Sequence, residues 1–175
     1  SWLPLAVTLA IQALVSMALL TLPVMAPVVS EAVGVSATYV GLYVALVYVG
    51  AMIASLSSGA AVAHYGALRV SQIGLLICAL GLSLCALPSL PLMVAGALLI
   101  GLGYGPATPA SSHLLARTTS ADNMSLVFSL KQTGVPLGGV MAGAILPGLL
   151  LLTNWQVAML GVAFACVVCA ALSQF

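Results

Sequence analysis

Long runs of apolar residues, separated by short polar breaks, dominate the chain from end to end. A transmembrane helix needs about 20 mostly apolar residues to cross a hydrocarbon layer roughly 30 Å thick. The runs predict an all-α membrane protein with six transmembrane helices. We expect a turn at residues 28–35, a polar break at residues 64–69, and Ser36 as the N-cap of the second span. The predicted spans cover residues 2–27, 36–63, 70–87, 91–115, 124–152 and 155–175.

Composition agrees with this pattern, because 63% of the residues are hydrophobic and 3% are charged. Water-soluble domains carry roughly a quarter charged residues, so a soluble class is excluded. The five charged residues form no basic face, and no nucleic-acid partner is expected. The lipid bilayer is the expected surrounding of this chain. Those residues are Glu31, Arg69, Arg117, Asp122 and Lys131.

The four cysteines, Cys78, Cys85, Cys166 and Cys169, all lie inside apolar runs. Disulfide frameworks are instead built in short polar loops of secreted domains. Cys166 and Cys169 have no metal-ligating neighbour in the sequence, so we interpret all four as packing residues. The sequence predicts no metal site and no cofactor.

The cations predict which side of the membrane each loop faces. Short loops rich in Lys and Arg stay on the cytoplasmic side. His64 and Arg69 lie between the second and third spans, and Arg117 lies between the fourth and fifth, whereas Glu31 is on the other side. We therefore expect a cytoplasmic N-terminus.

An internal repeat emerges at an offset of 88 residues, which places Gly50 over Gly138 and Ala54 over Ala142. This register divides a single six-helix bundle into two repeats, at about residues 1–88 and 89–175. Because each repeat has three spans, the second must insert with opposite topology. Such inverted repeats occur in many secondary transporters, where the substrate path follows the repeat interface.

Small residues and prolines concentrate in the fourth and fifth spans. Glycines spaced by four allow helices to approach closely in lipid, and we interpret Gly134, Gly138, Gly139 and Gly143 as helix-packing residues. Prolines remove backbone donors inside a span and free carbonyls that need another partner. We therefore expect bends at Pro106, Pro109 and Pro136.

The loop between the second and third spans resembles the signature loop of the major facilitator superfamily. Gly59, Gly66 and Arg69 match that pattern, His64 stands at its first basic position, and Ala63 replaces its usual acid. The stretch from Lys131 to Gly139 is similar to the fifth helix of many bacterial members. By this resemblance, Gly59, His64, Gly66 and Arg69 form a gating loop that lacks the acid-based latch.

The resemblance covers the chain as the first six of twelve helices. It implies a bacterial inner-membrane transporter that works by alternating access around a central site between two six-helix bundles. The second bundle is either the rest of a longer chain or a second copy in a homodimer.

Lys131 is the principal candidate site residue, because a rise of about 1.5 Å per residue puts it roughly 10 Å into the hydrocarbon. A central lysine costs about 2.5 to 3.5 kcal/mol on insertion scales, so it needs a cavity or a partner. One hypothesis is that its ammonium binds an anionic substrate. The alternatives are that it snorkels to the headgroups or pairs with a carbonyl freed by Pro136.

Other polar residues in apolar spans complete the candidate substrate site. Gln12 and Ser16 are four residues apart and share one face of the first span, Gln132 follows Lys131, and Tyr104 lies among glycines of the fourth span. The predicted function is secondary active or facilitative transport of a small organic anion. The alternative is a non-transporting six-helix scaffold subunit. No enzyme is expected, since Ser112 and His113 are adjacent and no serine elbow is present.

Overall fold

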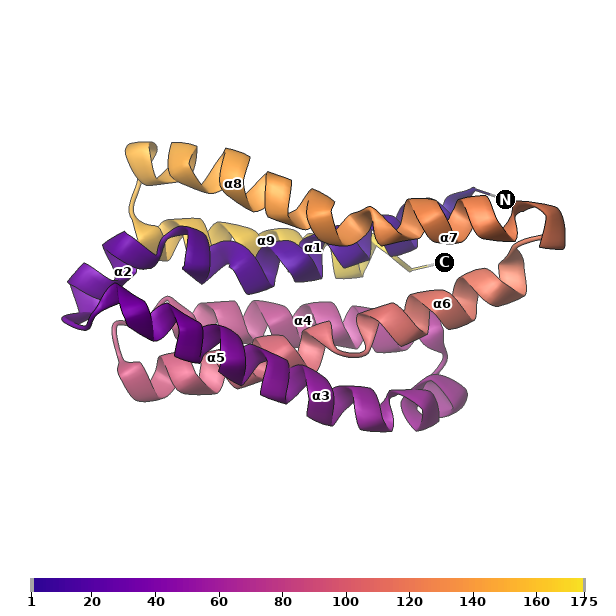
Figure 1. Cartoon of the computed structure of the whole chain (residues 1–175), viewed down its shortest axis with the longest axis horizontal. Helices are drawn as coiled ribbons and strands as arrows, with labels where there is room; N and C mark the ends of the chain where they lie inside the picture. Colours follow the sequence, from indigo (N-terminus) through magenta and orange to yellow (C-terminus); the bar gives the residue numbers. More distant parts are fainter. Residues whose placement is uncertain (1, 175) are drawn as a thin grey trace.

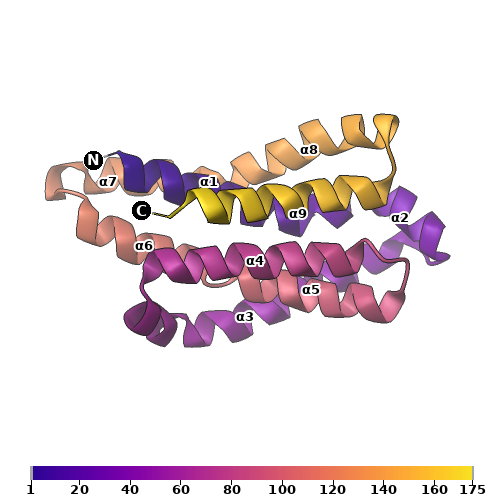
Figure 2. The same ribbon diagram turned by 180° about the vertical axis from the view of Figure 1, so that it is seen from behind.

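The computed structural model describes residues 2–174, and all regular secondary structure in that range is helical. Six segments are long and apolar enough to cross a membrane, which confirms the predicted number of spans. They lie side by side along the long axis of the molecule (Figures 1 and 2). The helices are α1 (Leu3–Val24), α2 (Ala26–Val33), η1 (Ala37–Tyr39), α3 (Val40–Tyr65), α4 (Ala67–Cys85), α5 (Leu90–Tyr104), α6 (Ala107–Thr118), η2 (Ala121–Asn123), α7 (Met124–Gln132), α8 (Gly134–Leu152) and α9 (Trp155–Leu172).

The segment after the first span differs from the prediction, since most of the expected turn at residues 28–35 is helix α2. Proline is tolerated in the first turn of a helix, where its missing N–H would have no partner anyway. The helix therefore breaks at Met25, and Pro27 lies in the first turn of a new helix. That helix ends at Val33, and Gly34 follows it in a left-handed conformation (φ 78°) that glycine adopts readily. Ser36 caps η1 as expected, because its side chain accepts a hydrogen bond from the backbone N–H of Thr38.

The fourth and fifth spans break where bends were expected. The fourth divides into α5 and α6 at Gly105 and Pro106, and the fifth divides into α7 and α8 at Thr133. Pro109 lacks the N–H that would bond to the Gly105 carbonyl, and Ser55 of α3 donates to that oxygen instead, at 3.3 Å. A neighbouring helix thus supplies the missing donor.

The predicted polar break at residues 64–69 is much narrower in the structure. Helix α3 continues to Tyr65 and α4 begins at Ala67, so Arg69 lies in the first turn of α4. Gly66 alone makes the turn, with φ 88° and ψ 151°. This region of backbone space is open almost only to glycine, which is why one residue suffices.

Two helix contacts are especially close, and we call them seams: the first lies between α1 and α8, and the second between α3 and α5. Helix α1 packs against α8 and α9, α5 packs against α3 and α4, and α4 packs against α9. At the first seam, a Cβ on Gly138 would collide with the Ala13 carbonyl; at the second, a Cβ on Gly50 would lie 3.2 Å from the Gly101 Cα. Adding 88 residues converts Gly50 to Gly138 and Ala13 to Gly101. The two seams therefore pair positions that are 88 residues apart; the repeat and its inverted arrangement stay predictions.

Burial follows the seams and leaves the outer faces apolar. The main buried cluster joins residues of α1, α3, α4, α5, α8 and α9, including Val15, Leu82 and Met159. Large apolar side chains such as Leu56 and Leu151 are 90% and 88% exposed. An outward apolar surface of this kind is the surface that hydrocarbon chains solvate.

Candidate functional site

Lys131 lies in the last turn of α7, directly before the break at Thr133. Its side chain is 2% exposed. The Nζ atom donates hydrogen bonds to the Ser112 Oγ at 2.7 Å and to the Thr108 carbonyl at 3.2 Å, both on α6. The Phe128 ring, one turn earlier on α7, has its centroid 5.8 Å from Nζ, within the range of a cation–π attraction. Lys131 therefore joins α7 to α6 through its charge.

These contacts bear on the three interpretations of Lys131, whose role in binding stays a prediction. The side chain turns inward to α6, so it does not snorkel to the headgroups. Its backbone acceptor belongs to Thr108 and not to the carbonyl of Gln132 that Pro136 frees. Both acceptors are neutral oxygens, so the positive charge has no acidic partner among residues 2–174. The observed pairing with a backbone carbonyl and a hydroxyl is compatible with a structural role as well as with the anion-binding hypothesis.

Gln12 of α1 is joined to the lysine through Thr108. The Thr108 hydroxyl donates to Gln12 Oε1 at 3.3 Å, while the Thr108 carbonyl accepts from Lys131. Gln12 is 2% exposed, and its Nε2 has no hydrogen-bond partner among the described residues. Because an amide nitrogen offers two N–H donors, Gln12 contributes unused donors to the cluster.

Ser16 lies one turn further along the same face of α1 as Gln12. It is 3% exposed, and its Oγ makes no hydrogen bond within the described part of the chain. Tyr104, at the end of α5, lies beside Ser16. Its ring packs edge-on against Tyr48, with centroids 6.4 Å apart. Tyr104 thus borders the cluster of α1, α6 and α7 from the fourth span.

Gln132 is the expected site residue that does not join this cluster. It is exposed, whereas Lys131 beside it is buried. Neighbouring residues of a helix point about 100° apart. Since Lys131 points toward α6, Gln132 points away from it.

The glycines of α8 position the polar residues of α1. A Cβ on Gly134 would lie 2.9 Å from both Cβ and Cγ of Gln12, and one on Gly138 would lie 2.6 Å from the Ser16 Cβ. Gly139 is less confined, since its nearest neighbour would be Leu20 at 3.4 Å. Gly143 faces open space within this bundle, so its packing role has no counterpart among the described residues.

Sequence reasoning missed Thr108 and Ser112 as partners of Lys131. Neither residue is among the site residues that the sequence predicts. A signal was present, because the two are four residues apart and therefore share one face of the fourth span. The break at Pro106 determines which helix that face meets, and this is a property of the fold.

The predicted gating loop occupies the junction of α3 and α4. Gly59 lies within α3 with no atom near its Cβ position. The His64 ring contacts the Tyr65 ring edge-on, with ring centroids 4.6 Å apart. Both His64 and Arg69 are exposed. Basic side chains thus flank the Gly66 turn at one end of the bundle.

Neither a cluster of potential metal ligands nor a disulfide is found among residues 2–174. No group of three His, Cys, Asp or Glu side chains gathers there, and the four cysteines carry free thiols. Cys78 and Cys85 donate weakly to the carbonyls of Ile100 and Met93 on the neighbouring α5. These two contacts are interhelical packing contacts.

The cluster therefore presents a buried ammonium, an amide and hydroxyls, which suit recognition of oxygen-rich anions. Comparison with curated proteins found no match to the chain. Comparison with protein families found one that covers nearly all of it: the model of the Major Facilitator Superfamily matches residues 7–175. Together with six apolar spans of sufficient length, this match shows that the chain belongs to the Major Facilitator Superfamily, a family of membrane transporters.

Proposed function

We propose that this chain is the six-helix half of an alternating-access transporter for a small organic anion, and that Lys131 attracts the anion. Family membership supports membrane transport in general and does not favour the scaffold alternative. The single observation that carries the substrate proposal is the state of Lys131, which is 2% exposed and bonded only to neutral oxygens.

The energetics of a buried charge favour an anionic ligand. A lysine near the bilayer centre costs about 2.5 to 3.5 kcal/mol on insertion scales. Bonds to Thr108 and Ser112 satisfy its donors but leave its charge unneutralised. The two acids, Glu31 and Asp122, lie in α2 and η2, and neither pairs with Lys131 among residues 2–174. A carboxylate entering the site would supply the missing negative charge.

Gln12 and Ser16 support a solute with more than one oxygen. Both are buried with a polar atom that lacks a partner, and an unmet buried donor costs about 1 to 3 kcal/mol. A solute carboxylate near Lys131 could place a second oxygen toward this pair. Because no acidic side chain accompanies the cluster, exchange or facilitated transport of the anion is the simplest mechanism for this half.

The remaining parts of the proposal concern assembly and orientation. Alternating access requires a second six-helix bundle, from a longer chain or from a homodimer partner. Arg69 and Arg117 support a cytoplasmic N-terminus by the positive-inside rule, and we propose the bacterial inner membrane as the location. In this orientation His64 and Arg69 of the gating loop face the cytoplasm. The mass of the intact native protein distinguishes a twelve-helix chain from a dimer.

Uptake into proteoliposomes tests the substrate proposal. The intact protein is assayed with a panel of small mono- and dicarboxylates, their neutral amides and matched cations. We expect selective uptake of carboxylates, and at least a tenfold weaker apparent affinity in Lys131→Met. Lys131→Arg should retain part of the uptake, since it keeps the charge.

Arg117→Met is the matched control, because it removes an exposed cation at the end of α6. It should transport as the parent protein does. Equal carboxylate affinity in folded Lys131→Met and the parent would remove Lys131 from the site. No uptake of any solute by the intact protein would instead favour the scaffold alternative.

A further inference from the structure

Tyr48 of α3 is an aromatic residue that the proposed anion site does not include. Its ring packs edge-on against Tyr104 of α5, with the ring planes at 86° and the centroids 6.4 Å apart. Tyr104 in turn lies beside Ser16 of α1, one turn from Gln12. The two rings therefore continue the row of polar side chains that ends at Lys131.

The arrangement of the helices places these rings across α1 from the lysine. Helix α1 lies between α8 on one side and α3 and α5 on the other (Figures 1 and 2). Lys131 belongs to α7, which continues into α8, whereas Tyr48 and Tyr104 belong to α3 and α5. A solute held beside α1 would therefore meet the ammonium from one side and the aromatic rings from the other.

Both rings present surface that a solute can reach. Tyr48 is 49% exposed, and Tyr104 is only partly buried. Tyr48 lies near the middle of the segment Ala37–Tyr65, and Tyr104 lies at the middle of Leu90–Thr118. Tyrosines that face lipid concentrate instead at the two membrane–water interfaces, where the hydroxyl is hydrated. Exposed rings at this depth therefore favour contact with a solute path over contact with hydrocarbon.

We propose that the transported anion is an aromatic carboxylate, and that Tyr48 is a specificity-determining residue that packs against its ring. This inference rests on the proposed function, because Lys131 must hold the carboxylate. Aromatic rings favour edge-on or offset packing at centroid distances of about 4.5 to 7 Å. The ring of the solute would extend the edge-on packing that Tyr48 already makes with Tyr104.

The spacing along the fourth span is suited to one small molecule. Tyr104, Thr108 and Ser112 follow one another at intervals of four residues, and the Lys131 Nζ contacts the last two. At about 1.5 Å per residue, the ammonium lies roughly 6 to 12 Å from Tyr104 along the helix axis. A carboxylate joined to a ring by a short linker can therefore contact both ends of the site.

A comparison of two carboxylates tests the proposal without any mutation. Binding of 3-phenylpropionate and of 3-cyclohexylpropionate to the intact protein is measured by isothermal titration calorimetry. The cyclohexyl ring is the more apolar of the two, so a preference for the phenyl compound reports aromatic contact. We expect 3-phenylpropionate to bind roughly 2- to 10-fold more tightly, the range of one aromatic pair. Equal affinities, or tighter binding of the cyclohexyl compound, would overturn the proposal.

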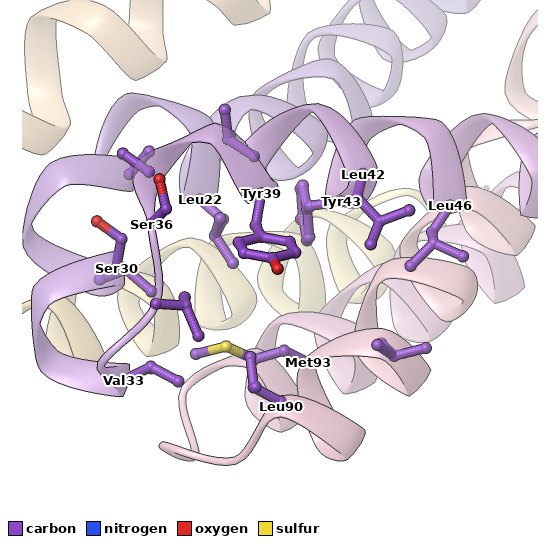
Figure 3. A pocket seen from close by; sticks show the side chains of 16 residues that line it. Leu22, Ser30, Val33, Ser36, Tyr39, Leu42, Tyr43, Leu46, Leu90 and Met93 are labelled. Carbon is purple, nitrogen blue, oxygen red and sulfur yellow. The ribbon is translucent and has the colours of Figure 1, made fainter.

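Variants of Tyr48 locate the contact. Tyr48→Phe keeps the ring and should keep the phenyl preference, whereas Tyr48→Leu should abolish it and leave the affinity for acetate unchanged. Tyr39→Leu is the matched control, because Tyr39 is 58% exposed and lines a separate apolar cavity beside α2 (Figure 3). This control should keep the phenyl preference. An unchanged preference in folded Tyr48→Leu would remove Tyr48 from the site.

Lys131→Met separates this inference from the proposed function. It should weaken the binding of acetate and of 3-phenylpropionate equally, by at least tenfold. Binding of acetate that depends on Lys131, without any phenyl preference, would overturn the aromatic inference and leave the proposed function standing. If neutral 3-phenylpropanamide binds as tightly as the carboxylate and depends on Tyr48, the carboxylate and the proposed function are wrong, although the ring contact is correct.

Discussion

Gly134 of α8 lies against the stem of Gln12 of α1, so that an added Cβ would stand 2.9 Å from the Cβ and Cγ of that glutamine. Contacts of this length are too short for real Cβ atoms, and the stem of Gln12 is held by its own helix. The absence of a side chain at Gly134 therefore determines where the Gln12 amide lies. Through Thr108, it also affects the environment of Lys131.

Gly134→Ala should displace Gln12 and weaken both folding and solute affinity. Overpacking of a filled site costs about 1 to 3 kcal/mol. Gly143→Ala is the control, because it meets no atom within 4 Å. Thermal unfolding in detergent and carboxylate binding measure the two effects. If Gly134→Ala matches Gly143→Ala in both, the proposed seating of Gln12 is wrong.

Ser112→Ala should destabilise the protein by removing the shorter of the two hydrogen bonds to Lys131. A hydrogen bond to a charged group contributes about 1.5 to 3 kcal/mol. Ser57→Ala is the matched control, since the Ser57 hydroxyl only donates to the Ala54 carbonyl of its own helix, at 3.1 Å. Denaturant unfolding compares the two variants, and equal loss of stability would show that the Lys131–Ser112 bond contributes little.

Gly101→Ala should be more damaging than Gly134→Ala. Its Cβ would collide with the Val47 carbonyl and lie 2.8 Å from the Ala51 nitrogen, so it meets backbone that cannot rotate away. We expect separation of α3 from α5 and a loss of roughly 3 kcal/mol or more, at the upper end of overpacking effects. Gly161→Ala, which faces open space, serves as the reference in thermal unfolding. A small effect at Gly101 would mean that the α3–α5 seam is looser than described.

Gly66→Ala tests the turn between α3 and α4. A residue with a side chain at φ 88° and ψ 151° costs about 1 to 3 kcal/mol. Gly59→Ala changes a helical glycine with open space around it and should be neutral or stabilising by up to about 1 kcal/mol. The difference in melting temperature between the two variants checks the conformation of this turn.

The sequence alone predicted the spans, the breaks at Pro106 and Pro136 and the cap at Ser36, because these depend on local properties: apolar length, a missing N–H and a side-chain oxygen. Helix α2 was missed because Pro27 was interpreted as an end, although proline also begins helices. The break at residues 64–69 was overestimated because its polar residues extend the helix ends, leaving only Gly66 outside them.

The site was predicted less completely than the fold. Burial of Lys131, Gln12 and Ser16 followed from polar residues in apolar spans. Their partners did not, because the contact of Lys131 with Thr108 and Ser112 joins residues about 20 positions apart, and the angle between α6 and α7 determines it. Gln132 was predicted to border the same cavity as Lys131 from a direction about 100° further around the helix; it is exposed, and its part in the site stays a prediction.

The close contacts at Gly138 and Gly101 restrict how this bundle can move. Where the main chains of two helices touch, no side chains lie between them that could change rotamer as the helices slide. The carbonyl of one helix then blocks sliding of the other. We therefore expect α1 and α8, and likewise α3 and α5, to move together as rigid bodies. The hinge of any large conformational change of the bundle must therefore lie outside the α1–α8 and α3–α5 contacts.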